Sequence, residues 1–506
     1  MNIFNLIGRY MLLMGKVFSR PERRSVYKRR VLAEMETLGL NSIGIVTLVS
    51  VFMGAVLMLQ MCINFESPFI PRELMGYATR ETMILEFSST VVALILAGRV
   101  GSSIASEIGT MRITEQIDAL EIMGVNSASY LILPKIIATV IFFPLLAILS
   151  IVVGLIGGYA ITLVTGIIIP DTYITGIKMD FRLFSIVYAL IKMIVYAFVH
   201  LRLLRLLRQR ELARSGACQH QGRGGEFGSD TDDGPYNHPN LLPVIRCEHI
   251  YKSFDGKPVL EDISATFLPG EINMIIGRSG SGKTVLIKSI AGLFPVDEGE
   301  IYYGDTLFTS LDFRQKKAIR RDVGMIFQGG ALLDSSTVEE NIRFPLDMFT
   351  GQSMAEKRER VAFCLHRVNL EGAEKLYPAE LSGGMIKRVA IARAIVMNPR
   401  YLFCDEPNSG LDPVTSNVID RLIYDITKEY GITTIINTHD MNSVMEIGEK
   451  IVFINQGRKG WEGTSADILH TDNRALNDFV FASNMAKKVK EAARPQDSDT
   501  RNASEN

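Results

Sequence analysis

A glycine-rich segment, GRSGSGKT, occupies residues 277–284 and contains the residue types that bind phosphate groups. It follows the apolar run INMII and precedes the helical run VLIKSIAGL, which is the order of strand, loop and helix that such loops require. Backbone N–H groups of the loop and the positive end of the helix face the phosphates, while Lys283 reaches the outer phosphates and Thr284 offers a hydroxyl to Mg²⁺. The expected nucleotide-binding residues of this loop are Gly277, Arg278, Ser279, Gly280, Ser281, Gly282, Lys283 and Thr284.

Two adjacent carboxylates end another apolar run, YLFCDE, further along the chain. At the end of a buried strand, Asp405 can hold Mg²⁺ and Glu406 can polarise the attacking water. The two motifs together predict hydrolysis of a nucleoside triphosphate.

Four further motifs accompany the pair. LSGGM (residues 381–385) precedes it, SGLD (409–412) follows it, Gln328 ends the run MIFQ, and His439 closes IINTH. Their order and spacing resemble the ATP-binding cassette family. The resemblance implies ATP and Mg²⁺ as cofactors and makes Gln328 a Mg²⁺ ligand together with Thr284 and Asp405. It also implies Gln328 as a catalytic residue linking the magnesium site to a membrane domain, and His439 as a catalytic contact to the γ-phosphate.

The resemblance also implies a second copy of the chain. Ser382, Gly383 and Gly384 would close over ATP bound to the opposite subunit, so one cassette cannot form a closed site and we expect a homodimer. Phe254 is the expected aromatic partner of adenine, with Tyr251 as the competing candidate.

The length and charge of the chain favour several domains and disfavour nucleic acid as a partner. It has 506 residues, with 54 Lys and Arg against 55 Asp and Glu, but the first half is apolar and the second half is charged. The five cysteines lack the spacing of a metal site or a disulfide framework, and we expect them to be reduced and structural. We therefore interpret the first half as a membrane domain and the second half as a soluble domain.

Apolar runs at about 42–63, 83–104, 135–166 and 183–199 approach the length of a membrane-spanning helix. Basic residues precede the first run and follow the fourth, which predicts that both flanks, and the ATPase, are cytoplasmic. The N-terminal run MNIFNLIGRYMLLMGKVF suits a helix in the membrane interface, with a cleaved signal peptide as the alternative.

The predicted fold is an all-α polytopic membrane permease followed by an α/β phosphate-loop ATPase, in which strand-like runs alternate with helical ones. We expect the permease at residues 1–199, an irregular linker at 200–240, the ATPase at 241–482 and a disordered tail at 483–506.

The cytoplasmic loop at 105–134 contains a helical stretch suited to pressing into the ATPase surface, or alternatively to acting as a solvated connector. Its segment from Glu107 to Leu120 is similar to the MlaE permease family, and the ATPase half is similar to the partner ATPase MlaF. This resemblance implies phospholipid transport between the inner and outer membranes, location in the inner membrane, and an MCE-domain lipid-binding protein as partner.

The chain departs from that family in two respects. Members have a fifth span and carry permease and ATPase on separate polypeptides, whereas similarity here vanishes across residues 200–240. A frameshift that fused two adjacent genes and a genuine fusion are both open. The functional alternatives are a cassette transporter of another substrate, a fusion with ATPase activity only, and a soluble cassette ATPase acting on nucleic acid.

Overall fold

The computed structural model describes residues 8, 11, 14–19, 23–214 and 243–481, with side chains omitted from 199 to 214. The chain divides into two units, each considered by itself. The helical unit comprises Met1–Thr110 and Asn126–Ser215, and the sheet unit comprises Met111–Val125 and Gly216–Asn506. A short segment between two long helices therefore groups with the sheet unit.

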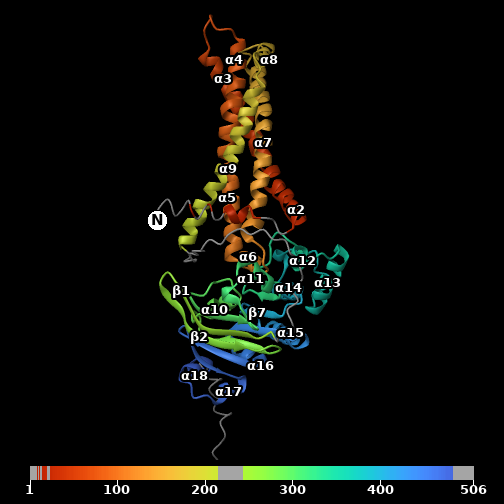
Figure 1. The fold of residues 1–506 in the computed structure, drawn as a ribbon. Coiled ribbons are helices and arrows are strands. Elements are labelled where there is room, and N and C mark those ends of the chain that lie inside the picture. Colours follow the sequence, from red (N-terminus) through yellow and green to blue (C-terminus); the bar gives the residue numbers. More distant parts are fainter. Residues whose placement is uncertain (1–7, 9–10, 12–13, 20–22, 215–242, 482–506) are drawn as a thin grey trace, which may run out of the picture. The chain divides into compact units, whose positions relative to one another are not determined.

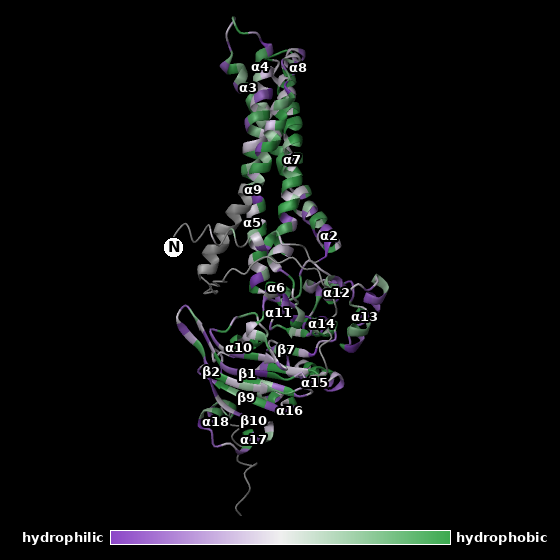
Figure 2. Ribbon diagram, viewed as in Figure 1, coloured by the Kyte–Doolittle hydropathy of each residue, from purple (hydrophilic) through white to green (hydrophobic). Residues whose placement is uncertain are grey.

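Long apolar helices dominate the helical unit, as Figure 2 shows by their hydropathy. In chain order the helices of this unit, long and short, are α2 (Arg24–Glu34), the π-helix η1 (Met35–Leu40), α3 (Asn41–Asn64), α4 (Glu73–Thr82), the π-helix η2 (Met83–Val91), α5 (Val92–Ile113), α7 (Ser127–Thr165), α8 (Pro170–Lys178) and α9 (Leu183–Arg214).

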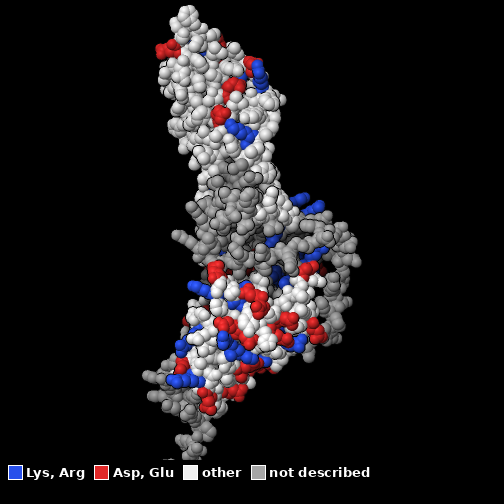
Figure 3. Space-filling model, turned by 60° about the vertical axis from the view of Figure 1, so that its left-hand side comes forward, with Lys and Arg blue, Asp and Glu red and all other residues white. Residues whose placement is uncertain are grey.

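Three continuous helical segments among the described residues are long and apolar enough to cross a membrane: Arg24–Asn64, Glu73–Ile113 and Ser127–Thr165. A fourth crossing needs α8 and α9 together, as a pair bent by 79°. Each of the first three extends beyond the apolar run that predicted it. On the face drawn in Figure 3, the described part of the helical unit carries few charged side chains, whereas the sheet unit carries many.

Small residues allow α3 and α7 to pack closely. A side chain on Gly54 would place its Cβ 1.7 Å from the carbonyl oxygen of Gly154, so the two backbones are in contact at this point. Ser50 Oγ donates to Ser150 Oγ at 2.8 Å in the same interface. Close packing of small residues is a general way to hold helices together where water is absent.

A buried charge cluster ties three helical segments of this unit together. Lys135 Nζ, on α7, lies 2.8 Å from Glu34 Oε2 and 2.6 Å from Glu107 Oε2, which belong to α2 and α5. Arg30 lies 3.6 Å from each of the two carboxylates. Two cations therefore balance two anions where Lys135 is only 2% exposed.

The sheet unit contains two sheets, shown in Figure 1. The six-stranded sheet has the order β10-β9-β3-β8-β7-β6, and all neighbours except β10 and β9 are parallel. Its strands are β3 (Ile272–Ile276), β6 (Val323–Ile326), β7 (Tyr401–Asp405), β8 (Thr433–Thr438), β9 (Lys450–Asn455) and β10 (Arg458–Gly463). The antiparallel sheet contains β1 (Ile245–Phe254), β2 (Lys257–Phe267), β4 (Glu298–Tyr303) and β5 (Thr306–Leu307).

Side chains of β3 alternate between two hydrophobic cores. Met274 and Ile276 belong to a core shared with the helices α14 and α15, whereas Ile275 belongs to one shared with the antiparallel sheet and α10. This two-sided burial is typical of a parallel sheet. The helices are α10 (Lys283–Ile290), α11 (Phe313–Arg320), α12 (Val338–Phe349), α13 (Met354–Arg367), α14 (Gly383–Ile395), α15 (Pro413–Tyr430), α16 (Met441–Ile447), α17 (Ser465–His470) and α18 (Arg474–Val480), together with α6 (Gln116–Ile122) from the grouped segment.

The predicted fold class is confirmed, because an apolar helical unit precedes an α/β unit with a parallel sheet. Helix α9 continues to Arg214, well into the segment expected to be irregular, while residues 215–242 lie outside the described part. The interfacial helix and the C-terminal tail also fall largely on residues that are not described. Cys62, Cys247, Cys364 and Cys404 are buried and free, as expected.

Candidate nucleotide site

The predicted phosphate loop connects β3 to α10. Gly277 has a φ of 153°, and a Cβ there would lie 2.2 Å from the carbonyl oxygen of Ile454, so only glycine fits at the start of the loop. Lys283 Nζ donates to the carbonyl oxygens of Gly277 and Arg278, at 2.9 and 3.1 Å. The ammonium group is thus held within the loop, and burial lowers its pKa despite the opposing charges of Glu406 and Asp405.

Thr284 and Asp405 meet directly, as the magnesium prediction requires. Thr284 Oγ1 donates to Asp405 Oδ1 at 3.2 Å, although the residues lie in separate motifs. Parallel pairing of β7 with β8 places Asp405 beside Asn437, and Asn437 Nδ2 donates to Asp405 Oδ1 at 2.6 Å. Burial raises the pKa of Asp405 to about 6, an effect that Lys288 and these two hydrogen bonds oppose.

The residues present fit Mg²⁺. The ion prefers hard oxygen ligands from carboxylates, hydroxyls and water, and Thr284 and Asp405 supply the first two kinds. Asn437 Oδ1 is a further oxygen at this point, buried and without a hydrogen-bond partner in the described structure. When bound, the ion would neutralise the charge of the outer phosphates.

Three predicted catalytic side chains also lie together. Glu406 Oε2 accepts from Gln328 Nε2 at 3.1 Å, and Glu406 Oε1 lies 3.2 Å from His439 Nδ1. Gln328 also donates to Ser409 Oγ at 3.2 Å, which connects it to the predicted SGLD motif. The backbone of Glu406 has a φ of 46°, an uncommon value for a residue with a side chain. The carboxylate is therefore held between an amide and an imidazole at the end of β7.

Lys387, which the sequence motifs did not point to, supports this arrangement from α14. Its side chain is 4% exposed, and its Nζ donates to the carbonyl oxygen of Gln328 and, at 3.4 Å, to that of Glu406. One buried cation therefore anchors the backbones of two predicted catalytic residues. The sequence feature that could have pointed to Lys387 is a lysine within the largely buried helix GGMIKRVAIARAI.

The predicted signature residues begin α14. Ser382 is its N-cap and accepts a hydrogen bond from the backbone N–H of Met385, while Ser382 and Gly383 are exposed. An exposed helix N-terminus can receive an anion, which agrees with the predicted role toward a second subunit.

The predicted adenine contact stays a prediction. Phe254 ends β1, and its ring packs edge-on against Phe294 with centroids 5.6 Å apart. Tyr251, the competing candidate, is 36% exposed on the same strand.

The predicted cytoplasmic helix docks into a groove of the sheet unit. In α6, Ala119 and Ile122 join the hydrophobic core that contains Phe327 and Met325. Ala119, Ile122 and Met123 line a groove with Phe327 and with residues of α11, α12 and α14, leaving a cavity of about 30 Å³. The solvated-connector alternative is therefore wrong for residues 116–123, although the helical stretch is shorter than the predicted loop because α5 continues to Ile113.

Polar contacts fix the same segment. Gln116 Nε2 donates to Asp334 Oδ2 at 2.8 Å, and Arg320 donates to the carbonyl oxygen of Glu121. Lys288, on the helix that follows the phosphate loop, contacts Glu115 and Asp118 at 2.7 and 3.0 Å. Glu115 has a φ of 60°, which aims the chain into α6.

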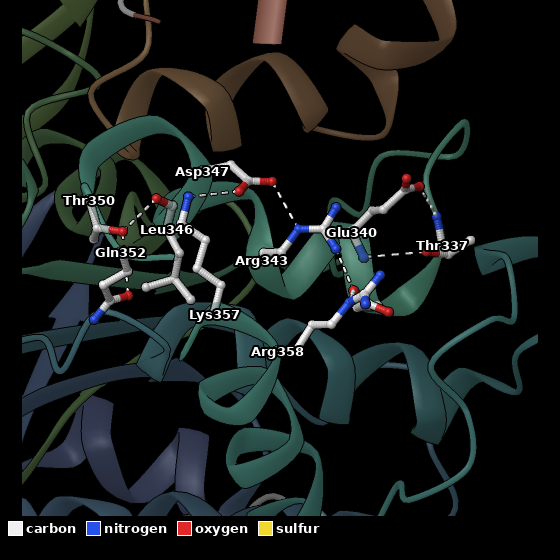
Figure 4. A network of polar contacts seen from close by, with 10 residues as sticks. Thr337, Glu340, Arg343, Leu346, Asp347, Thr350, Gln352, Lys357 and Arg358 are labelled. Atoms are coloured by element: carbon white, nitrogen blue, oxygen red, sulfur yellow. Dashed lines mark hydrogen bonds and ion pairs between the residues drawn. The ribbon is translucent and has the colours of Figure 1, made fainter. Parts of the chain in front are cut away.

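Helix α12 contributes Pro345 and Phe349 to this groove and is held by an ion-pair network. Figure 4 shows Asp347 between Arg343 and Lys357, with separations of 2.9 and 3.0 Å. A capping box at Thr337 and Glu340 begins the helix. The groove wall is thus anchored to α13, which carries Lys357.

Direct contacts join Thr284 to Asp405, and join Glu406 to Gln328 and His439. Lys283 contacts carbonyl oxygens of the phosphate loop, and the charges of Glu406 and Asp405 act on it. The structure adds Asn437, Lys387 and Lys288, which the motifs did not identify. Asn437 had one signal in the sequence, because it is a polar residue in a buried strand two positions before His439.

Comparison with known families gives two matches along the chain. Residues 31–201 match the family described as "Permease MlaE", and residues 260–409 match the family described as "ABC transporter". The two matched regions correspond to the helical unit and to the core of the sheet unit.

Curated relatives match the C-terminal half. The methionine import ATP-binding protein MetN 2 of Rhodopseudomonas palustris is 41% identical over 228 residues, 45% of this chain and 60% of the relative. The corresponding MetN of Clostridioides difficile is 37% identical, over 47% of this chain and 74% of that protein. The sulfate/thiosulfate import ATP-binding protein CysA of Mesorhizobium japonicum is 39% identical, over 47% of this chain and 67% of that protein. The chain therefore spans less than two thirds of the first of these relatives.

A solved structure of the ATP-binding cassette MJ0796, a dimer in a post-hydrolysis state bound to ADP and phosphate, is 31% identical with a TM-score of 0.42. The matched region covers 44% of this chain and 98% of the chain in that structure.

Proposed function

Because the chain belongs to the ATP-binding cassette transporters and joins their ATPase domain to a MlaE-type permease domain, we propose that it uses ATP hydrolysis to move phospholipid between the inner and outer membranes. ATP hydrolase activity follows from the family and from the catalytic cluster around Glu406. The identity of the substrate as phospholipid and the location in the inner membrane are proposals.

The position of α6 in the ATPase is the observation that supports coupling between ATP hydrolysis and transport. This helix belongs by sequence to the segment between two apolar helices, yet its apolar side chains complete a core of the ATPase. Glu115, which precedes the helix, and Asp118, in its first turn, contact Lys288, one helical turn beyond Thr284. A change in the phosphate loop on ATP binding therefore reaches the permease segment through direct contacts.

Phospholipid as the substrate is supported by the permease family and by composition. Residues 31–201 match the permease family, and the three long apolar helices expose many large apolar side chains. An ion path would place more ionisable groups in these helices.

A closed site needs a second copy of the chain in this proposal. The exposed Ser382 and Gly383 complete the ATP site of the partner, and Mg²⁺ is held by Thr284 and Asp405. Glu406 polarises the attacking water, and His439 and Gln328 orient the γ-phosphate and the metal site. An MCE-domain lipid-binding protein on the outer side of an inner membrane is the proposed partner.

Another small-molecule substrate is the second candidate, because the relatives are named as import proteins for methionine and for sulfate or thiosulfate. The test is reconstitution of the full chain in proteoliposomes, with labelled phospholipid, methionine and sulfate offered in parallel. The proposal predicts ATP-dependent movement of phospholipid alone, abolished in Glu406→Gln. Movement of methionine or sulfate, with phospholipid unmoved, would select the second candidate, and hydrolysis without any movement would select a fusion with ATPase activity only.

We also propose that permease and ATPase form one polypeptide. The intact mass of the ATPase-bearing chain from native membranes tests this, with 56.3 kDa expected for the fusion. Two shorter chains would identify a frameshift at the join.

A further inference from the structure

Asn437 lies at the centre of the parallel sheet, between the strands that lead to the two halves of the magnesium site. On β8 it pairs with Ile275 of β3, which leads to the phosphate loop, and with Asp405 of β7. Its side chain is fully buried. A polar side chain that is buried in a sheet needs hydrogen-bond partners.

The amide nitrogen of Asn437 connects both predicted magnesium ligands. Nδ2 donates to Asp405 Oδ1 at 2.6 Å and to Thr284 Oγ1 at 3.2 Å, and Thr284 Oγ1 itself donates to Asp405 Oδ1. The opposite amide orientation would aim an oxygen at a carboxylate, so the contact with Asp405 fixes which end of the amide is nitrogen. The three side chains form a closed triangle.

The other end of the same amide is unpartnered. Asn437 Oδ1 is buried and accepts no hydrogen bond in the described structure. Asn273, which is equally buried on the adjacent β3, is different: its Oδ1 accepts from the N–H of Leu268, and its Nδ2 donates to three carbonyl oxygens. Asn273 is therefore a structural asparagine, whereas Asn437 contacts Thr284 and Asp405 through Nδ2 and keeps a buried Oδ1 without a partner.

We propose that Asn437 is a positioning residue of the magnesium site: its Nδ2 holds Thr284 and Asp405 in place, and its Oδ1 accepts a hydrogen bond from water bound to the metal. Partners behind metal ligands commonly set ligand orientation in this way. The inference rests on the proposed use of Mg²⁺ with ATP. It adds to the site a residue to which the sequence motifs assigned no role.

The test measures metal dependence of nucleotide binding in the full chain, not turnover. Asn437→Leu keeps the size of the side chain and removes both polar ends, and Asn437→Ser keeps a small polar group should the first variant fail to fold. Binding of a fluorescent ATP analogue is titrated with Mg²⁺ and repeated in EDTA, and Mn²⁺ affinity is measured separately by electron paramagnetic resonance.

The expected result is a rise of about tenfold or more in the Mg²⁺ and Mn²⁺ concentrations for half-saturation, with metal-free nucleotide binding unchanged. Asn273→Leu is the matched control and should lower thermal stability without changing metal dependence. Unchanged half-saturation in a folded Asn437 variant would overturn the proposal, and so would an equal shift in the Asn273 variant. If the parental protein bound the analogue equally well with and without metal, the proposed use of Mg²⁺ would itself fail.

Discussion

Lys288 Nζ lies 2.7 Å from Glu115 Oε1, joining the helix of the phosphate loop to the segment that precedes α6. Lys288 is 6% exposed, and although burial disfavours its charge, Asp118 and Glu115 together raise its pKa. The lysine therefore stays charged and its contact with Glu115 is an ion pair. It gives the segment Met111–Val125 an electrostatic link to the nucleotide site.

This pair should show a measurable coupling energy. In a double-mutant cycle of Lys288→Met and Glu115→Gln, thermal unfolding should give a coupling of about 1 to 2 kcal/mol, since hydrogen bonds between charged, partly buried groups contribute that much. ATP-driven lipid movement should fall more than ATP binding in each single variant. The exposed pair Lys428 and Glu449 is the control, with a coupling near zero. If the stability changes of the two single variants simply added in the double variant, Lys288 and Glu115 would have no energetic coupling and could not link α6 to the nucleotide site.

Glu406→Gln should keep nucleotide binding and lose hydrolysis. The substitution retains the contacts to Gln328 and His439 but removes the carboxylate, and loss of a general base lowers the rate by about 10² to 10⁴-fold. The dimer should then remain closed in ATP, which size-exclusion chromatography detects. Lys283→Ala is the contrasting variant, because it should weaken ATP binding itself. Hydrolysis at the parental rate in Glu406→Gln would assign the water-activating role to another residue.

Asp405→Asn should stabilise the ligand-free protein in a pH-dependent manner. Burial raises the pKa of Asp405 from 3.8 to about 6, so the folded state is favoured by this group when it is protonated and loses that advantage as pH rises through 6. The neutral variant should gain about 3 kcal/mol at pH 8 and roughly half of that at pH 5. Thermal unfolding without nucleotide or metal measures the difference. If the gain in the free energy of unfolding were the same at both pH values, burial would not be destabilising the ionised carboxylate of Asp405.

Lys135→Ala should destabilise the helical unit strongly. It removes the cation that lies between Glu34 and Glu107, and breaking a buried pair by deleting one partner costs about 3 to 5 kcal/mol. Arg182→Ala is the control, because its partner Asp180 is 53% exposed in the connection between α8 and α9 and the expected cost is below about 1 kcal/mol. Thermal unfolding in detergent should separate the two variants. Equal effects would mean that Lys135 is not part of a buried cluster.

The fold and the main site could be predicted because their signals are local. The phosphate loop is set by consecutive glycines between a strand and a helix, and Asp405 and Glu406 end a recognisable apolar run. The apolar helices follow from composition over a window as long as the helix itself.

The remaining features depend on contacts between distant segments. Asn437 meets Thr284 only because β8 lies between β3 and β7, and Lys387 reaches Gln328 only because α14 packs beside β6. Side-chain type alone does not distinguish Asn437 from Asn273, since both occupy buried strands. The continuation of α9 to Arg214 could not be predicted from the apolar run, because arginines replace apolar residues at this end of the helix.

The measurement that tests phospholipid transport most directly is the lipid content of the full chain purified in detergent, before and after ATP. If the protein transports phospholipid, the purified protein should contain phospholipid that exchanges for labelled phospholipid when ATP and Mg²⁺ are added and is retained without exchange in Glu406→Gln. A parental protein that hydrolyses ATP while holding no phospholipid, or holding lipid that exchanges equally in Glu406→Gln, would rule out ATP-driven phospholipid transport.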